Sequence, residues 1–145
     1  LEVRIKLATM QLAGGQGLEA RDEAIWLLTQ EPTNEAALML LVDSSVSTNH
    51  LRDAAQQLAR LQPVAGQTAG WHLAQGALHL RQRELPAAEA ALRQALALDP
   101  QSRVAHSLLG NLALLRNDPT NALAAFTAAA AVTRPSCHIL RVDLK

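Results

Sequence analysis

The segment LPAAEAALRQALALDP, residues 85–100, decides the fold of this chain of 145 residues. Its apolar residues recur at the spacing of one helical face, and they form the stripe Ala88, Ala91, Leu92, Ala95 and Leu96. Asp99-Pro100 ends the pattern, because a proline disfavours helical geometry in the residue before it. The segment therefore predicts an amphipathic helix over residues 87–98.

Two residues of this stripe belong to columns that repeat with a step of 34 residues. One column is Ala20, Ala54, Ala88 and Ala122, and a second is Ala24, Leu58, Leu92 and Phe126. Several columns in one phase are typical of stacked repeats rather than of a single-core globule. We therefore expect one domain, 1–145, with four units. They span residues 1–34, 35–68, 69–102 and 103–136, and residues 137–145 follow them.

Each unit reads as two helices joined by a short turn. In the fourth unit we expect helices over 103–116 and 120–133, with Asp118 as the N-cap and Pro119 in the first turn of the second helix. Runs of alternating β-branched residues are missing from the sequence. We therefore expect an all-α protein.

The second unit is less regular in its sequence. Asn49 is expected to cap its second helix, which would end near Pro63. The longest connection of the chain would then run from Pro63 to Gly70, and we expect a bend or a mobile loop there.

The pattern resembles the tetratricopeptide repeat (TPR) family, whose unit is a helix–turn–helix of 34 residues. In the fourth unit the resemblance rests on His106, Leu109, Gly110, Asn111, Ala122, Phe126 and Ala129. In the third unit it rests on Gly76, Leu85, Ala88, Leu92, Ala95 and Pro100. The resemblance covers the whole chain and implies a right-handed α-solenoid. The second unit departs from the pattern, because Leu41-Val42 replaces the glycine-containing pair of the first helix.

Composition argues against several classes of protein. Thirteen basic residues balance thirteen acidic ones, whereas a nucleic-acid binder usually has a basic surface. No apolar run is long enough to span a membrane, and the single cysteine, Cys137, allows no internal disulfide. The preference for arginine over lysine indicates a GC-rich bacterial genome. Because the chain begins at Leu1 already in phase with the repeat, we expect a fragment of a longer soluble protein, bacterial and either cytoplasmic or periplasmic.

Three histidines could be read as metal ligands. His72 and His79 lie seven residues apart, and His106 follows His72 by one period. Without accompanying cysteines or carboxylates in a ligand pattern, packing between helices is the favoured interpretation. No pair of acid and base residues suggests catalysis, and Gly14-Gly15-Gln16-Gly17 follows a helix rather than a strand. We expect no enzyme activity, no metal and no cofactor.

The resemblance also implies a concave groove lined by the first helix of each unit. The matching positions are Ile5, Thr9, Met39, Asp43, Leu73, Ala77, Ser107 and Asn111, with Leu12, Leu80 and Leu114 deeper along the groove. A mostly apolar lining suits an amphipathic helix or peptide of a protein partner. The alternative is that these residues pack within the core and the groove is inert.

The sequence is compatible with several roles. A protein-interaction scaffold is the first hypothesis. The alternatives are the substrate-recruiting arm of a glycosyl- or sulfotransferase, and a part of a bacterial envelope secretion or polysaccharide-export system. Residues Cys137–Lys145 could cap the array or begin a fifth repeat, and exposed repeat ends could pair between copies.

Overall fold

The computed structural model describes residues 1–133, and all regular structure in this range is α-helical. The helices are α1 (Glu2–Ala13), α2 (Gly17–Gln30), α3 (Glu35–Asp43), α4 (Thr48–Ala65), α5 (Ala69–Arg81), α6 (Leu85–Leu98), α7 (Arg103–Leu115) and α8 (Pro119–Thr133). The expected all-α fold is confirmed. The choice between a cap and a fifth repeat for residues 137–145 lies outside the described residues.

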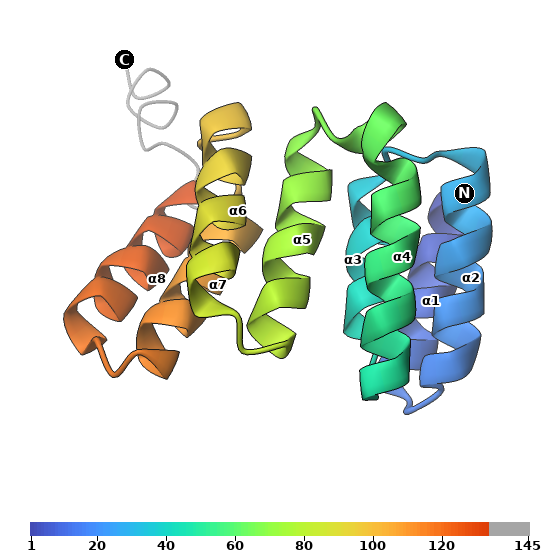
Figure 1. Ribbon diagram of the computed structural model, residues 1–145, viewed down its shortest axis with the longest axis horizontal. Helices are drawn as coiled ribbons and strands as arrows, with labels where there is room; N and C mark the ends of the chain where they lie inside the picture. Colours follow the sequence, from blue (N-terminus) through green and yellow to red (C-terminus); the bar gives the residue numbers. More distant parts are fainter. Residues whose placement is uncertain (134–145) are drawn as a thin grey trace, which may run out of the picture.

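Consecutive helices form four pairs that stack along the long axis of the molecule (Figure 1). The odd-numbered helices form a continuous layer, because α1 contacts α3, α3 contacts α5 and α5 contacts α7. Within residues 1–133, the backbones of successive even-numbered helices do not approach one another closely, although Arg21 of α2 reaches Asp53 of α4 through its side chain. The even-numbered helices therefore lie outside the odd-numbered layer, as in an α-solenoid.

Three of the four pairs turn at an equivalent residue with left-handed backbone geometry. Gly15, Arg83 and Asn117 have φ values of 82°, 63° and 56°, and they are separated by two periods and one period of 34 residues. This conformation suits glycine and asparagine and is uncommon for arginine. The expected cap at the fourth turn is confirmed, because Asp118 Oδ1 accepts a hydrogen bond from the Asn121 amide at 3.1 Å.

The second pair differs from the prediction at both ends of α4. The cap is Ser47 rather than Asn49, since the Ser47 hydroxyl accepts a bond from the His50 amide at 3.2 Å. The helix continues past Pro63 to Ala65, which is fully buried and holds the last turn against the core. The expected long connection is therefore wrong, and only residues 66–68 separate α4 from α5.

Glycines in the odd-numbered helices let the two helices of a pair approach closely. A Cβ atom on Gly76 of α5 would lie 2.6 Å from the Leu92 side chain of α6. A Cβ atom on Gly110 of α7 would lie equally close to the ring of Phe126 in α8. In both pairs, a large residue on the even-numbered helix fills the space that glycine leaves open.

Candidate functional site

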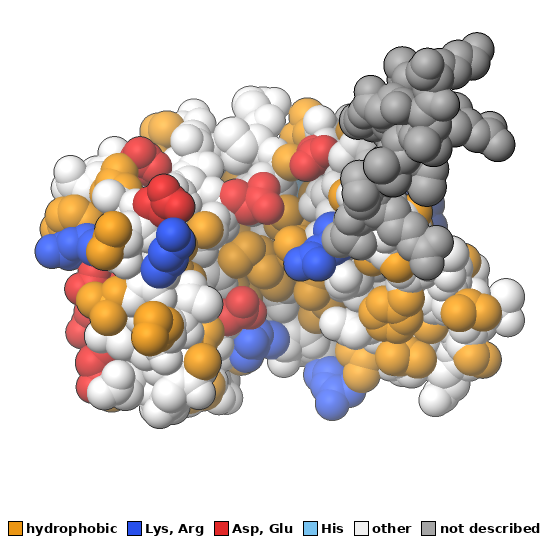
Figure 2. Space-filling view, turned by 180° about the vertical axis from the view of Figure 1, so that it is seen from behind, with side chains coloured by type: hydrophobic (Ala, Val, Ile, Leu, Met, Phe, Trp, Pro, Cys, Tyr) orange, Lys and Arg blue, Asp and Glu red, His pale blue; other side chains and the backbone are white. Residues whose placement is uncertain are grey.

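The odd-numbered helices form one hollowed face of the molecule. Figure 2, which views the molecule from the side of α1, α3 and α7, shows hydrophobic side chains in the middle of this face with charged side chains around them. A hollow of about 330 Å³ opens where α3, α5 and α7 meet. Its lining residues are Asp43, Ala77, Leu80, Arg81, Leu108, Asn111 and Leu115. We call this hollow the central groove.

The floor of the central groove is apolar and continuous with the core. Leu80 and Leu108 are half-buried and pack against a cluster that contains the fully buried Leu73. Leu115, on the last turn of α7, remains exposed beside them. The groove therefore offers apolar surface that no other described element covers.

A charged pair forms one edge of the central groove. Arg81 Nη2 lies 3.2 Å from Asp43 Oδ1, so the pair bridges α5 and the end of α3. Arg81 Nη1 also donates to the Ser45 carbonyl oxygen at 3.5 Å. Both charged side chains are partly exposed, so the pair positions the rim and contributes little to stability.

Asn111 supplies an uncommitted polar group on the opposite side. Its side chain is exposed, and within residues 1–133 it makes no hydrogen bond. An amide side chain can donate and accept at once, which suits the backbone or a polar side chain of a bound segment. The groove thus combines an apolar floor with an available hydrogen-bonding group.

The structure brings together only some of the predicted groove residues. Asp43, Ala77 and Asn111 line the central groove, together with Leu80, which was predicted to lie deeper along it. Leu73 is fully buried beneath it, packed with Leu92, Ala95 and Ala105, so its side chain belongs to the core. Met39 also packs partly against that cluster.

The other predicted groove residues lie elsewhere. Ile5 and Thr9 are on α1, where the Thr9 hydroxyl donates to the Ile5 carbonyl oxygen at 2.8 Å. Ser107 lines a separate hollow at the α8 end of the array. None of these three residues lines the central groove.

Three lining residues were missed by the sequence prediction, namely Arg81, Leu108 and Leu115. Each lies three or four residues from a predicted position on the same helix, Arg81 after Ala77, and Leu108 and Leu115 on either side of Asn111. Residues at these spacings share a helical face. Extending each predicted position by one turn would have found them.

The three histidines considered as metal ligands each have a local partner. His72 stacks edge-on with Trp71 at 5.2 Å, and His79 Nδ1 lies 2.7 Å from Glu84 Oε2. His106 Nε2 lies 3.2 Å from the Pro100 carbonyl oxygen. No group of three or more potential ligands in residues 1–133 could hold a metal ion.

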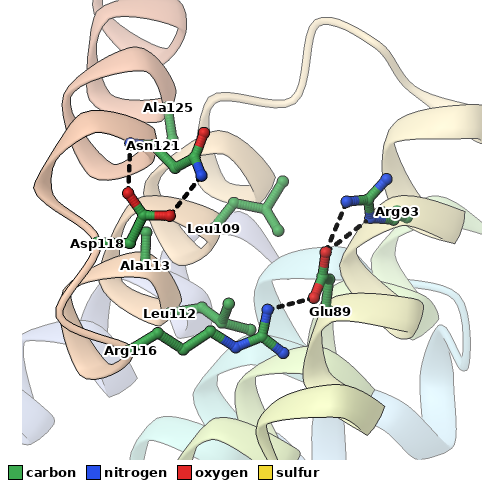
Figure 3. Close-up of a pocket in the computed structure, with 9 residues that line it drawn as sticks. All are labelled: Glu89, Arg93, Leu109, Leu112, Ala113, Arg116, Asp118, Asn121 and Ala125. Atoms are coloured by element: carbon green, nitrogen blue, oxygen red, sulfur yellow. Dashed lines mark hydrogen bonds and ion pairs between the residues drawn. The ribbon is translucent and has the colours of Figure 1, made fainter.

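A smaller pocket lies between α6, α7 and α8, on another part of the surface (Figure 3). Arg93 and Arg116 both donate to the Glu89 carboxylate, and these bonds hold the pKa of Glu89 below its usual value. Hydrogen bonds from the backbone and side chain of Asn121 lower the pKa of Asp118 in the same way. Because these charged groups satisfy one another, we place the candidate site in the central groove.

None of the described helices is long and apolar enough to cross a membrane. A family model described as "Tetratricopeptide repeat" matches residues 41–103 and 73–136. No curated protein sequence matches the chain.

Several solved structures share this fold. The thermophilic TPR protein TTC0263 of Thermus thermophilus is 28% identical, with a TM-score of 0.74, over 97% of this chain and 77% of its own. A crystal structure of MamA is 20% identical, with a TM-score of 0.57, over 87% and 74%. The Cut9–Hcn1 assembly of the APC/C matches at 18% identity and a TM-score of 0.67, over 96% of this chain and 27% of that one.

Proposed function

The chain belongs to the tetratricopeptide repeat family, and on this premise we propose that it is an interaction scaffold whose central groove receives an amphipathic helix or short peptide of a protein partner. The observation that supports the proposal is the groove lining itself. One hollow, formed by three helices, combines an apolar floor, a charged edge and an available amide. Recognition of a helix in a groove uses apolar anchors at helical spacing with polar contacts at the rim.

The chemistry of the groove defines the kind of segment that would fit. Leu80, Leu108 and Leu115 would contact one or two apolar anchor side chains of the partner. Asn111 would hydrogen-bond a polar group beside these anchors. The charged edge is internally paired, so the partner segment needs no strong net charge to bind.

The test begins with peptides selected from a displayed random library by binding to this chain. Their affinities are then measured by fluorescence anisotropy for three proteins: the unchanged chain, Leu115→Glu and Leu98→Glu. Leu115 lines the groove, whereas Leu98 is a comparably exposed leucine at the end of α6 and serves as the matched control.

We expect Leu115→Glu to lower the affinity for the selected peptides about tenfold or more, because it places a charge against apolar anchors at the centre of the contact. Leu98→Glu should leave affinity unchanged. Equal affinities for both variants would show that the peptides bind elsewhere and would exclude the central groove as the site.

A further inference from the structure

Helix α1 exposes an apolar stripe that no described element covers. Val3, Leu7 and Met10 are 79%, 46% and 72% exposed. Their spacing of four and three residues places them on one face of the helix. An exposed contiguous apolar patch of this kind marks an interaction surface.

The repeat period shows what this face does elsewhere in the molecule. Three periods later, the same positions hold Ala105, Leu109 and Leu112 of α7. Ala105 and Leu112 are buried and Leu109 is half-buried, and α7 packs there against α6 of the preceding pair. The stripe on α1 is therefore the surface that an interior helix turns toward its preceding pair.

The opposite end of the array exposes a complementary apolar surface. Phe126 of α8 is 36% exposed, whereas Ala24, Leu58 and Leu92, at the same position in the other pairs, are fully buried. Beside Phe126 is a hollow of about 470 Å³ that is lined in part by Arg103, Ser107 and Ala129. This end thus presents the surface on which a following helix would pack.

We propose that α1 of a second copy of this chain docks on the α7–α8 end of the first, so that the solenoid continues from one molecule into the next. Val3, Leu7 and Met10 of the second copy would occupy the place that Ala105, Leu109 and Leu112 occupy against the third pair. A head-to-tail contact of this kind leaves a free end on each copy, so that repeated association adds further copies and gives an open assembly or a ring.

The charged residues at the two helix starts also favour this alignment of the two copies. At the α3–α5 contact, a Cβ atom on Gly70 would lie 2.9 Å from Cβ of Glu35, so the starts of these helices are adjacent. The same positions at the proposed contact are Arg103 of one copy and Glu2 of the other. An acidic and a basic side chain would therefore meet where the two helix starts approach.

The chain's own last residues match this position only in part, since Ile139 lies one period after Ala105, where a second copy would place Val3. One period after Leu109, where α1 of a second copy would place Leu7, the sequence has Asp143. Placing a carboxylate against an apolar surface is costly. The second copy is accordingly the occupant that the sequence register favours.

The test uses two variants of the full chain that each block one end. Met10→Glu puts a charge on the α1 stripe, and Ser107→Glu puts one in the hollow at the α8 end. Sedimentation velocity is recorded over a series of concentrations for each variant and for the control Leu98→Glu. The unchanged chain and the control should show an average mass that rises with concentration. In each blocked variant the dissociation constant of self-association should rise about tenfold or more.

Mixing distinguishes this arrangement from other modes of pairing. An equimolar mixture of the two blocked variants should form a discrete dimer, because each supplies the end that the other lacks. The proposal is overturned if Ser107→Glu still self-associates while Met10→Glu does not, which indicates pairing of α1 with α1. It is also overturned if the unchanged chain stays monomeric up to about 1 mM, the range of a weak contact.

A charge exchange provides a second test. Glu2→Arg and Arg103→Glu should each weaken association about twofold to fivefold, and the double variant should restore it. If the double variant is as weak as either single one, the proposed register is wrong.

Discussion

The second and third helix pairs have the same order of elements but pack differently. Helices α5 and α6 lie against each other along their length, whereas α3 and α4 make few contacts with each other. At one close contact, the third pair places Gly76 under Leu92. The second pair has Val42 and Leu58 at the equivalent positions, both fully buried. A bulky residue on each helix keeps the two axes apart, and glycine on one helix allows them to close.

The second and third pairs also differ in the turn that joins their two helices. Arg83 adopts left-handed geometry in the three-residue turn of the third pair. In the second pair the equivalent residue, Asn49, lies within α4, and residues 44–47 make the connection. Buried Ser45 in this connection accepts a hydrogen bond from Arg21 at 2.9 Å, and Arg21 also pairs with Asp53. These polar bonds thus join the connection and α4 of the second pair to α2 of the first pair.

The irregular second pair matters for the central groove. Helix α3 packs more extensively on α5 than on its own partner α4, and Gly70 permits this approach. The end of α3 then brings Asp43 to Arg81 at the groove edge. We infer that the wide spacing within the second pair helps to shape the groove.

Gly76→Val tests the packing difference and should have the largest effect. It gives the third pair the residue that the second pair has, and its side chain would overlap that of Leu92. We expect the free energy of unfolding to fall by about 3 kcal/mol. Urea denaturation followed by circular dichroism would measure it. Gly17→Ala is the control, because a Cβ atom there makes only ordinary contact, and its stability should be unchanged or slightly raised. A Gly76→Val protein as stable as the control would refute the packing explanation.

Asp53→Asn tests the polar link between the first two pairs. The Asp53 carboxylate is about as exposed as that of Asp43, but its partner Arg21 is 7% exposed and Arg81 is 38% exposed. Burial already lowers the pKa of Arg21, and loss of the carboxylate would leave its charge poorly compensated. We expect a loss of about 2 kcal/mol for Asp53→Asn and below about 1 kcal/mol for Asp43→Asn. Denaturation curves of equal midpoint for the two variants would contradict the buried role of Arg21.

Glu89→Gln tests the link between the third and fourth pairs and should have the smallest effect. In the second pair Ala55 stands at this position and forms no such link. Because the folded state lowers the pKa of Glu89 below 4.5, its stabilisation is present above that pH and is lost as the pH falls through the folded pKa. We expect the variant to lose about 1 kcal/mol at pH 7 and to match the unchanged chain in acid. A difference in midpoint that stays constant from pH 7 to acid would show that ionisation of Glu89 is not the cause.

The sequence predicted the architecture well where its repeat positions were occupied by favourable residues. The 34-residue columns indicated the helix pairs, and Asp118 marked a helix start that the structure confirms. The second pair was predicted less well, because Ser47 and Asn49 are both good caps and only the packing of α4 decides between them.

Groove residues were harder to predict than helices. The period identifies which helix faces the groove but not how deeply each side chain is buried. Leu73 and Leu80 lie on the same helix, yet only Leu80 lines the central groove. Their difference depends on where α7 crosses α5, which is a property of the packed array.

The most direct test of the central groove is a nuclear magnetic resonance titration of the chain with a library-selected peptide. We predict that the amide signals of Ala77, Leu80, Arg81, Asn111 and Leu115 shift most, with smaller changes on α4 and α6. Shifts confined to α2, α4, α6 and α8 would place the binding surface on the outer helices and contradict the account.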